Sequence, residues 1–269
     1  LAILSCPGCG KPASQNENIS GKRLISLSPS ITGQIIDLGA EDNIVGVTPY
    51  HPTLKRDIPL VGTYITPSIE KIILLKPDII LMSEEDGEIQ QNSFFEKFGL
   101  RYYRFGRNSS FKSICDNYLL LGEMIGRRET ASEKIEYYRQ RLNKVKKDNN
   151  ELKVAFLVSV KPLITVSGLS HISDIIKEAG GINIFSDLNV PYPILTLESL
   201  IIKKPDVVII MSPGEDLYLY RQLKNFTDID FINRKNIFVA GDEIIPYYSP
   251  KEYVLSVEKI SEILNHVNK

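Results

Sequence analysis

Cysteine and histidine are the side chains of this sequence that could bind a metal or carry out redox chemistry. Cys6 and Cys9 enclose Pro-Gly, so their spacing matches a redox Cys-x-x-Cys pair and supplies half of a typical zinc site. Both chemistries are disfavoured, because the pair precedes every periodic segment and is followed by the polar stretch 11–22. Metal-dependent hydrolysis is also disfavoured, because the chain has only three histidines to bind a catalytic metal. These are His51, His171 and His266.

Cys6 fits a different chemistry, the attachment of a lipid. The apolar segment before it resembles the end of a bacterial lipoprotein signal, with Ile3 and Ser5 at the expected apolar and small positions. The match is loose at Leu4, where a smaller residue is usual. The resemblance implies a lipid on Cys6 and a signal remnant and tether at 1–22. It also implies a periplasmic or cell-surface location, with the membrane reached only through the lipid.

Other residue patterns argue against an enzyme. The sequence has no G-x-S-x-G, P-loop, H-E-x-x-H or G-x-G-x-x-G motif. Ser167 precedes a glycine, but no histidine in a suitable context is available to activate it. We therefore predict a protein without catalytic residues, without a metal site and without a catalytic cofactor. A chelatase-like enzyme is the remaining catalytic alternative.

The composition is that of a globular protein large enough for two lobes. Of the 269 residues, 43% are hydrophobic and 24% are charged. The 32 basic residues are matched by 33 acidic ones, so there is no basic excess to bind nucleic acid. No apolar run approaches the roughly 20 residues that cross a bilayer. Cys115 lies at helical spacing among apolar residues, which indicates a buried structural thiol.

Two stretches of alternating strand and helix patterns would position any binding residues. In the first, strands are expected at 23–28 and 44–48 around a helix at 32–38. In the second, a strand is expected at 153–160 and a helix at 172–179. This alternation is typical of parallel βα units.

A helical region separates the two stretches. A helix is expected at 111–125, and a second one opens at Thr130, where Glu133 completes a capping box. The second helix continues for about 20 residues and forms a rod of roughly 30 Å. The sequence therefore predicts an α/β protein with two Rossmann-like lobes and mostly parallel sheets, joined by one long backbone helix. The expected boundaries are 23–107 for the N-terminal lobe, 108–150 for the helical segment and 151–269 for the C-terminal lobe.

An internal repeat indicates that the two lobes are structural siblings. Residues 70–82 recur about 128 positions later as residues 198–210, with Glu, Ile, Lys, Pro and Asp identical at matching places. Each copy reads as a helix ended by Lys-Pro and followed by an apolar strand that begins at Asp78 or Asp206. The expected helix caps are Thr66 and Thr196.

Several short motifs follow one another in an order that resembles one family, although no motif is specific alone. They are Arg-Leu-Ile-Ser-Leu-Ser-Pro-Ser at 23–30, Ile-Val-Gly-Val-Thr-Pro-Tyr at 44–50, Val-Gly at 61–62, Pro-Ser-Ile-Glu at 67–70, Gly-Gly-Ile-Asn at 180–183, Pro-Tyr-Pro at 191–193, Glu198, Asp242 and Ser-Pro at 249–250. The chain is similar to the helical-backbone (class III) periplasmic substrate-binding proteins of ABC importers, which carry cobalamin, haem and iron–siderophore complexes. Within that family it most resembles the cobalamin-binding group, and the resemblance runs from Arg23 to the C-terminus.

The resemblance implies a monomeric receptor that captures its ligand between the two lobes and delivers it to a permease dimer. The ligand contacts that it implies are Tyr50, Tyr64, Tyr192, Asp242, Tyr247 and His171. It also implies that Glu70 and Glu198 dock on arginines of the permease, one carboxylate per lobe for a two-fold partner. A single joining helix resists bending, so we expect small motions when the ligand binds.

The identity of the ligand stays open at this point. The sequence has no tryptophan, and Tyr64 and Tyr192 occupy two positions where the cobalamin-binding group has tryptophans. Haem is the first alternative, because Tyr64 with His171 or His51 could supply axial ligands. A ferric siderophore is the second, because its negative charge would favour arginines in the cleft. The candidates for that role are Arg101, Arg104 and Arg107.

Overall fold

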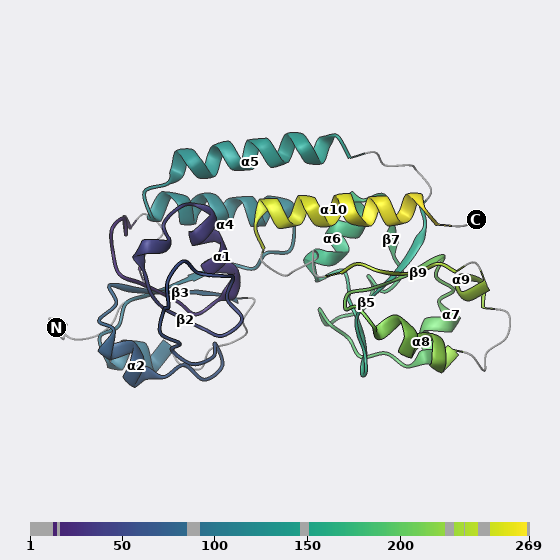
Figure 1. Ribbon diagram of the computed structural model, residues 1–269, viewed down its shortest axis with the longest axis horizontal. Helices are drawn as coiled ribbons and strands as arrows, with labels where there is room; N and C mark the ends of the chain where they lie inside the picture. The colour runs from purple at the N-terminus through teal and green to yellow at the C-terminus, as the bar shows by residue number, and fades with distance from the viewer. Residues whose placement is uncertain are drawn as a thin grey trace, which may run out of the picture. The chain divides into compact units, whose positions relative to one another are not determined.

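The computed structural model describes residues 13–14, 17–84, 92–145, 151–223, 229–233, 235–241 and 248–267. The chain divides into two compact α/β units (Figure 1). Among the described residues, unit 1 runs as far as Asn108 and also includes Lys112–Glu136 and residues 248–249. Unit 2 includes Ser109–Phe111 and the described residues from Tyr137 onward, apart from 248–249.

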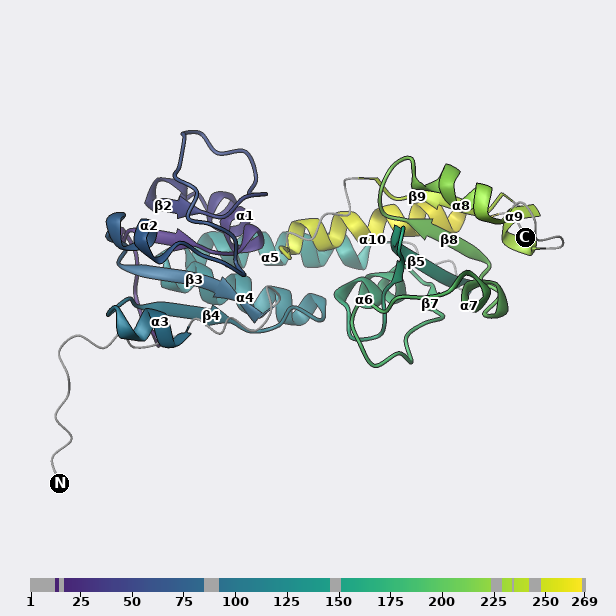
Figure 2. The ribbon, with the colours of Figure 1, turned by 90° about the horizontal axis from the view of Figure 1, so that it is seen from below.

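Unit 1 is built on a four-stranded parallel sheet in the order β2-β1-β3-β4. Figure 2 shows this order across the sheet, with β2 toward one edge and β4 at the other. The parallel sheet predicted for the first lobe is therefore confirmed. The strands are β1 (Leu24–Ser26), β2 (Ile44–Val47), β3 (Ile79–Ser83) and β4 (Tyr102–Phe105). The helices are α1 (Pro29–Asp37), the short 3-10 helix η1 (Glu41–Asn43), α2 (Ile69–Leu74), α3 (Asn92–Lys97) and α4 (Phe111–Met124).

The strands of unit 1 form because they are short, continuous apolar runs that can be buried on both faces. Every residue of β1 and of β3 is buried. Ile25, Ile80 and Met82 pack with Ile72 of α2 and Phe95 of α3 in one core cluster. Cys115 of α4 is buried, as the sequence predicted.

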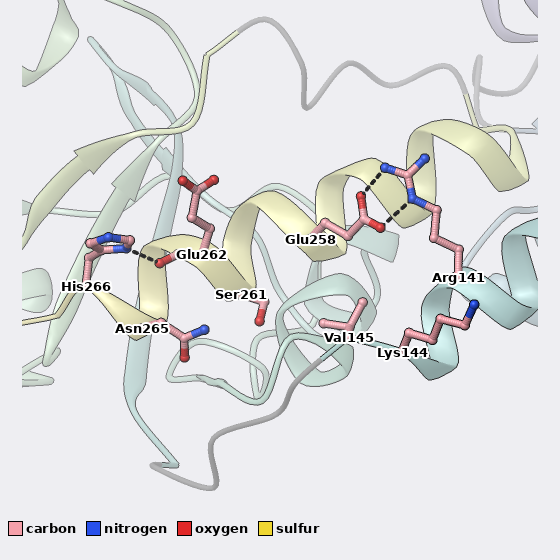
Figure 3. Close-up of a pocket in the computed structure, with 8 residues that line it drawn as sticks. All are labelled: Arg141, Lys144, Val145, Glu258, Ser261, Glu262, Asn265 and His266. Carbon is pink, nitrogen blue, oxygen red and sulfur yellow. Dashed lines mark hydrogen bonds and ion pairs between the residues drawn. The ribbon is translucent and has the colours of Figure 1, made fainter.

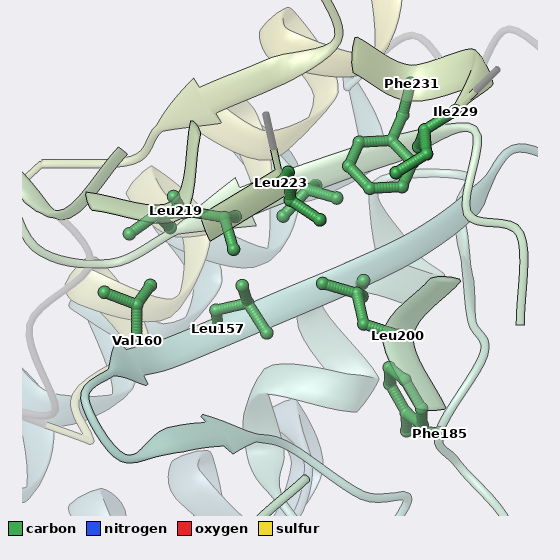
Figure 4. Packing of buried hydrophobic residues seen from close by; sticks show 11 residues of the cluster. Leu157, Val160, Phe185, Leu200, Leu219, Leu223, Ile229 and Phe231 are labelled. Carbon is green, nitrogen blue, oxygen red and sulfur yellow. The ribbon is translucent and has the colours of Figure 1, made fainter. Parts of the chain in front are cut away.

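Unit 2 repeats this plan around the long strand β5. β5 pairs in parallel with β7 and β8, β8 pairs in parallel with β9, and β6 is the antiparallel exception. Figure 4 shows the core on one face of this sheet, where Leu157 of β5 lies among Leu200, Leu219 and Phe231. The strands are β5 (Lys153–Val160), β6 (Leu163–Thr165), β7 (Ile182–Asn183), β8 (Val207–Ile210) and β9 (Ile237–Val239). The helices are α6 (His171–Glu178), α7 (Leu197–Ile202), α8 (Glu215–Leu223), α9 (Asp230–Asn233) and α10 (Pro250–Asn265).

Helix α5 (Arg128–Asn143) connects the two units along the chain, as predicted. It has 16 residues, so its length is about 24 Å. Its start differs from the prediction, because Thr130 lies inside the helix and caps nothing. Ile135 and Leu142 lie on its buried side. Within the part of the chain that the structure describes, neither this helix nor any other has the length and apolarity needed to cross a membrane.

The repeat seen in the sequence is also a repeat of hydrogen bonds. The Asp78 carboxylate accepts the backbone N–H of Arg23 at 2.8 Å, and the Asp206 carboxylate accepts that of Lys153 at 2.8 Å. In each unit this bond ties the aspartate that precedes β3 or β8 to the start of the unit's first strand, because Arg23 directly precedes β1 and Lys153 is the first residue of β5. Lys76 and Lys204 end the two helices with matching left-handed φ angles of 45° and 47°.

The caps of the two repeated helices match each other, and one of them differs from the prediction. Thr196 caps α7 as expected, because its hydroxyl accepts the N–H of Ser199 at 3.2 Å. In unit 1 the cap is Ser68, whose hydroxyl accepts the N–H of Lys71, and the predicted cap Thr66 is wrong. Thr66 hydrogen-bonds Thr63 instead. Pro67 does not open this helix, because Ser68 after it is still extended, with φ −81° and ψ 100°, and the helix begins at Ile69.

Candidate functional site

In parallel α/β units, ligands bind at the carboxyl ends of the strands, where the connecting loops meet. In unit 1 the loop after β2 occupies this edge and carries Tyr50 and Tyr64. Tyr50 is 87% exposed and has a left-handed φ of 68°, a conformation that costs a non-glycine residue about 1–3 kcal/mol. Tyr64 is partly exposed. Both predicted contacts therefore lie on a loop at the expected edge of the sheet.

The loop after β2 is held in place by backbone hydrogen bonds and by buried polar groups. Val47 donates to the Pro59 carbonyl at 3.1 Å, and Val61 donates to the Val47 carbonyl at 2.9 Å. The buried Glu41 carboxylate accepts the N–H of Lys55 at 2.5 Å. Gly62, with φ +93°, makes the turn before Tyr64, and a Cβ there would lie 2.6 Å from the Thr66 carbonyl oxygen. These contacts fix the backbone around the two tyrosines.

His51 lies directly after Tyr50 and lines a cavity of about 490 Å³ in the same loop. Its Nδ1 is 2.7 Å from the Pro52 carbonyl oxygen, which can only accept a hydrogen bond. A neutral imidazole in this contact carries its proton on Nδ1, and its Nε2 is left as the acceptor atom. His51 could therefore bind a metal or accept a hydrogen bond through its Nε2. The other lining residues are Thr53, Leu54, Lys55, Arg56, Asp57, Ile58 and Leu60.

Buried hydroxyl groups at the same edge of unit 1 were not foreseen from the sequence as functional candidates. Ser26 and Thr32 hydrogen-bond each other at 2.9 Å, and Ser28 and Ser30 do so at 2.8 Å, at the start of α1. The Thr48 hydroxyl is buried and has no hydrogen-bond partner among the described residues. The only sequence signal for this cluster was the serine-rich opening of the unit. These hydroxyls make the carboxyl end of the sheet polar.

In unit 2 the predicted contact Tyr192 lies on the loop between β7 and α7 and is 44% exposed. The residues on both sides of it are tied to the sheet region. Ser167 donates its N–H to the Pro191 carbonyl at 3.0 Å, and Thr165 donates to the Pro193 carbonyl at 3.1 Å. Two other predicted contacts, Asp242 and Tyr247, lie outside the described residues, as does the predicted lipidation site Cys6.

His171 is the first residue of α6 and is buried. The Ser170 hydroxyl caps the helix by accepting the N–H of Ile172 at 3.2 Å. Burial lowers the pKa of the His171 imidazole from 6.5 to about 4, because the apolar surroundings disfavour its charged form. The ring is therefore neutral at physiological pH, as a metal-binding histidine must be.

The two predicted docking carboxylates occupy equivalent places in the two units. Glu70 lies in the first turn of α2 and Glu198 in the first turn of α7. Both are exposed. Neither forms an ion pair within the described parts of the chain. Their charges are thus available to a partner.

The three arginines considered for an anionic ligand have different surroundings. Arg101 precedes β4, at the amino end of the sheet, and forms an ion pair with Glu17. Arg104 lies within β4, and its guanidinium contacts the sulfur of Met82 at 3.6 Å. Arg107 follows the carboxyl end of β4 and is exposed. Arg107 is therefore the best placed of the three for a ligand at this edge.

A second cavity, also of about 490 Å³, lies in unit 2 between the end of α5 and α10 (Figure 3). Its main polar feature is the two-pronged ion pair of Arg141 with Glu258, at 2.5 and 2.6 Å. This hydrogen-bonded carboxylate raises the pKa of the Arg141 guanidinium. None of the predicted ligand contacts lines this cavity. Among the described residues, moreover, no three His, Cys, Asp or Glu side chains are grouped as a metal site would require.

Two α/β units joined by one helix, with exposed aromatic residues on their loops, are the architecture of a substrate-binding protein. The family model described as "Periplasmic binding protein" matches residues 24–239, and the chain belongs to this family. Its members bind a substrate and deliver it to an ABC permease; they are not enzymes. The prediction of a non-catalytic protein is therefore confirmed by the family.

Three relatives illustrate the likeness. The chain is 29% identical over 192 residues to a vitamin B12-binding protein of Vibrio cholerae serotype O1, covering 70% of this chain and 69% of that protein. It superposes on the crystal structure of the periplasmic vitamin B12 binding protein of Vibrio cholerae with a TM-score of 0.76, 22% identity and coverage of 92% and 98% of the two chains. It superposes on the periplasmic haem-binding protein of the same species with a TM-score of 0.79, 20% identity and coverage of 91% and 99%.

Proposed function

We propose that this protein is the substrate-binding component of an ABC importer and that its ligand is cobalamin or a related corrinoid. The observation that carries the proposal is the exposed Tyr50, held in a left-handed conformation at the carboxyl end of the unit 1 sheet. Tyrosine offers a flat, partly polar face at low ordering cost, which suits a large planar macrocycle. The vitamin B12-binding relatives support the choice of ligand.

In this proposal one ligand is contacted by residues of both units. Unit 1 supplies Tyr50 and Tyr64, and unit 2 supplies Tyr192 together with the segment of Asp242 and Tyr247. The orphaned buried hydroxyl of Thr48 would gain a hydrogen-bond partner from a polar ligand or a bound water.

Haem is the second candidate ligand. Tyr64 and the two histidines His51 and His171 could supply axial ligands. The fold likeness to a haem-binding protein is a further reason why haem is considered as a ligand. A ferric siderophore is third, with Arg107 as the contact for its negative charge.

Absorbance titrations of the purified chain separate these ligands. We expect cyanocobalamin to bind saturably, with one ligand per chain and a dissociation constant that rises when Tyr50 or Tyr192 is replaced by alanine. Tight haem binding with a shifted Soret band that is lost in Tyr64→Phe or His171→Ala would contradict the order of candidates. Tight binding of a ferric siderophore that is lost in Arg107→Ala would also contradict it.

Delivery of the ligand is proposed to use Glu70 and Glu198 as contacts for arginines on the two subunits of a permease. A carboxylate and a guanidinium form strong, directional paired hydrogen bonds. The double variant Glu70→Ala/Glu198→Ala should lose uptake in cells while its affinity for cyanocobalamin stays unchanged. Unchanged uptake would refute the docking role. The exposed Glu129 of α5 provides a control carboxylate, and Glu129→Ala should transport normally.

We also propose that the protein is a monomer held at a bacterial membrane by a lipid on Cys6. Growth with a labelled fatty acid tests this directly. The label should be lost in Cys6→Ser and retained in the matched variant Cys9→Ser. Label in both variants, or in neither wild type nor variants, would contradict the anchor.

A further inference from the structure

Each unit exposes a large aliphatic residue one helical turn after its docking glutamate. In α2 this residue is Leu74, which is 72% exposed, and in α7 it is Ile202, which is 75% exposed. Residues four apart lie on the same face of a helix, about 5–6 Å apart at Cβ. Glu70 with Leu74, and Glu198 with Ile202, therefore form two like pairs of one charge and one apolar side chain, which we call the docking pairs.

Leu74 and Ile202 do not anchor their helices to the cores, because other residues do so. Ile72 of α2 and Leu200 of α7 point into the cores of their units and are fully buried. A single exposed leucine is ordinary on a protein surface. The same exposure at equivalent positions in two units is a second, independent observation, because each unit has its own core.

The surroundings of the docking pairs have changed between the two copies of the repeat, whereas the pairs have kept their chemistry. Position 71 is lysine in unit 1, and the equivalent position 199 is serine. Leu75 is matched by Lys203, which pairs with Asp187 at 3.3 Å. Position 71, which is exposed, thus tolerates the change from a charged to an uncharged side chain, and Leu75, which packs against the core of unit 1, is replaced by a charged residue in unit 2. The charge at 70 and 198 and the aliphatic character at 74 and 202 are kept in both copies, as is the isoleucine at 73 and 201.

We infer that the docking pairs are the contact surfaces for the permease, and that each permease subunit presents an arginine beside an apolar pocket that receives Leu74 or Ile202. This inference rests on the proposed delivery to a permease. The charge of the glutamate selects the arginine, whose weakly hydrated guanidinium and aliphatic stem can lie against the neighbouring leucine or isoleucine. Two like pairs in one chain fit a partner that itself presents two like sites, as a dimer does. The glutamates guide the encounter, and the aliphatic residues hold the complex by burial.

Binding of the full chain to the permease in lipid nanodiscs, measured at low salt and at about 1 M salt, tests the inference. Leu74→Ser/Ile202→Ser should weaken binding about tenfold at both salt concentrations, because burial of apolar surface is not screened. Glu70→Gln/Glu198→Gln should weaken it mainly at low salt. The control Phe94→Ser/Leu217→Ser, which removes exposed apolar residues of α3 and α8, should bind like wild type.

The outcomes separate this inference from the function on which it rests. Normal binding by Leu74→Ser/Ile202→Ser, together with weakened binding by the glutamate variant, would overturn the apolar contact and leave delivery intact. No binding of wild type to the permease would overturn both. Equal binding of wild type to nanodiscs that contain only phosphatidylethanolamine and phosphatidylglycerol would also overturn the inference, because the aliphatic residues would then contact lipid.

Discussion

Tyr50 is 87% exposed, and its backbone is held in a left-handed conformation. An exposed side chain on a strained but well-anchored loop supports the proposed role of Tyr50 as a ligand contact. We expect Tyr50→Ala to weaken the binding of cyanocobalamin about tenfold and to change the free energy of unfolding by less than about 0.5 kcal/mol. Calorimetric titration and urea unfolding measure the two effects.

Tyr137 of α5 is the matched control for Tyr50, because it is also an exposed tyrosine. Tyr137→Ala should leave the affinity for cyanocobalamin unchanged. If the two variants bind equally well, Tyr50 is not a ligand contact.

His171 makes the stability of the protein depend on pH. Its pKa is about 4 in the folded chain and 6.5 in the unfolded chain, so the unfolded state takes up the proton first as the pH falls. The stabilisation from the neutral buried ring is complete above pH 6.5 and is lost progressively below it. At pH 5 the loss should be about 2 kcal/mol. Urea unfolding at pH 7 and pH 5 measures it.

A variant without the buried imidazole should lack this part of the pH dependence. We expect His171→Gln to lose less stability between pH 7 and pH 5 than wild type does. His266→Gln, in which an exposed ring is removed, should behave like wild type. Equal slopes for all three proteins would show that His171 does not titrate as its burial requires.

The helices α2 and α7 depend on their first residues, and their caps can be tested by substitution. Ser68→Ala and Thr196→Ala should each lower the free energy of unfolding by about 1 kcal/mol, because a backbone N–H in the first turn then loses its acceptor. Thr66→Ala should cost less than about 0.5 kcal/mol, since its hydroxyl bonds only another exposed hydroxyl. If Thr66→Ala lowers the free energy of unfolding more than Ser68→Ala does, Thr66 caps α2 and the assignment to Ser68 is wrong.

The order of strands and helices could be predicted from the sequence, because apolar runs and their punctuation are local signals. β5, for example, occupies the predicted residues 153–160. Helix starts were less accurate, because several residues can cap a helix. Thr66, Ser68 and Thr130 are all good caps by type, and the path of the chain decides among them. The internal repeat could have identified the cap of α2, because Ser68 is the equivalent of Thr196, which was predicted correctly.

Less of the candidate site than of the fold could be predicted from the sequence. The tyrosines were nominated by family resemblance, and their exposure depends on how the loops after the strands are folded. The Glu41–Lys55 contact that anchors one of these loops joins residues whose pairing no local pattern signals. The exposed Leu74 and Ile202 were visible only as aliphatic positions of the repeat. An apolar residue in a short helix is usually read as core, so burial had to be measured before these two residues could be distinguished.

Considered as one molecule, the receptor depends on α5, which passes from unit 1 to unit 2 between Glu136 and Tyr137. Proline inside a helix removes a hydrogen bond and costs about 3 kcal/mol. Glu136→Pro should therefore weaken the binding of cyanocobalamin at least tenfold, because the proposed ligand site takes contacts from both units. Glu136→Ala should bind like wild type. Equal affinities in a calorimetric titration of the two variants would mean that an unbroken α5 is not required.

The central claim is that two sibling units contribute to the binding of one metal-chelate ligand. Calorimetric titration of the purified chain with cyanocobalamin tests it most directly, using wild type, Tyr50→Ala from unit 1 and Tyr192→Ala from unit 2. The account predicts one ligand per chain and a similar loss of affinity, about tenfold, in each variant. Absence of binding in wild type, a stoichiometry of two, or a loss confined to one of the two variants would contradict it.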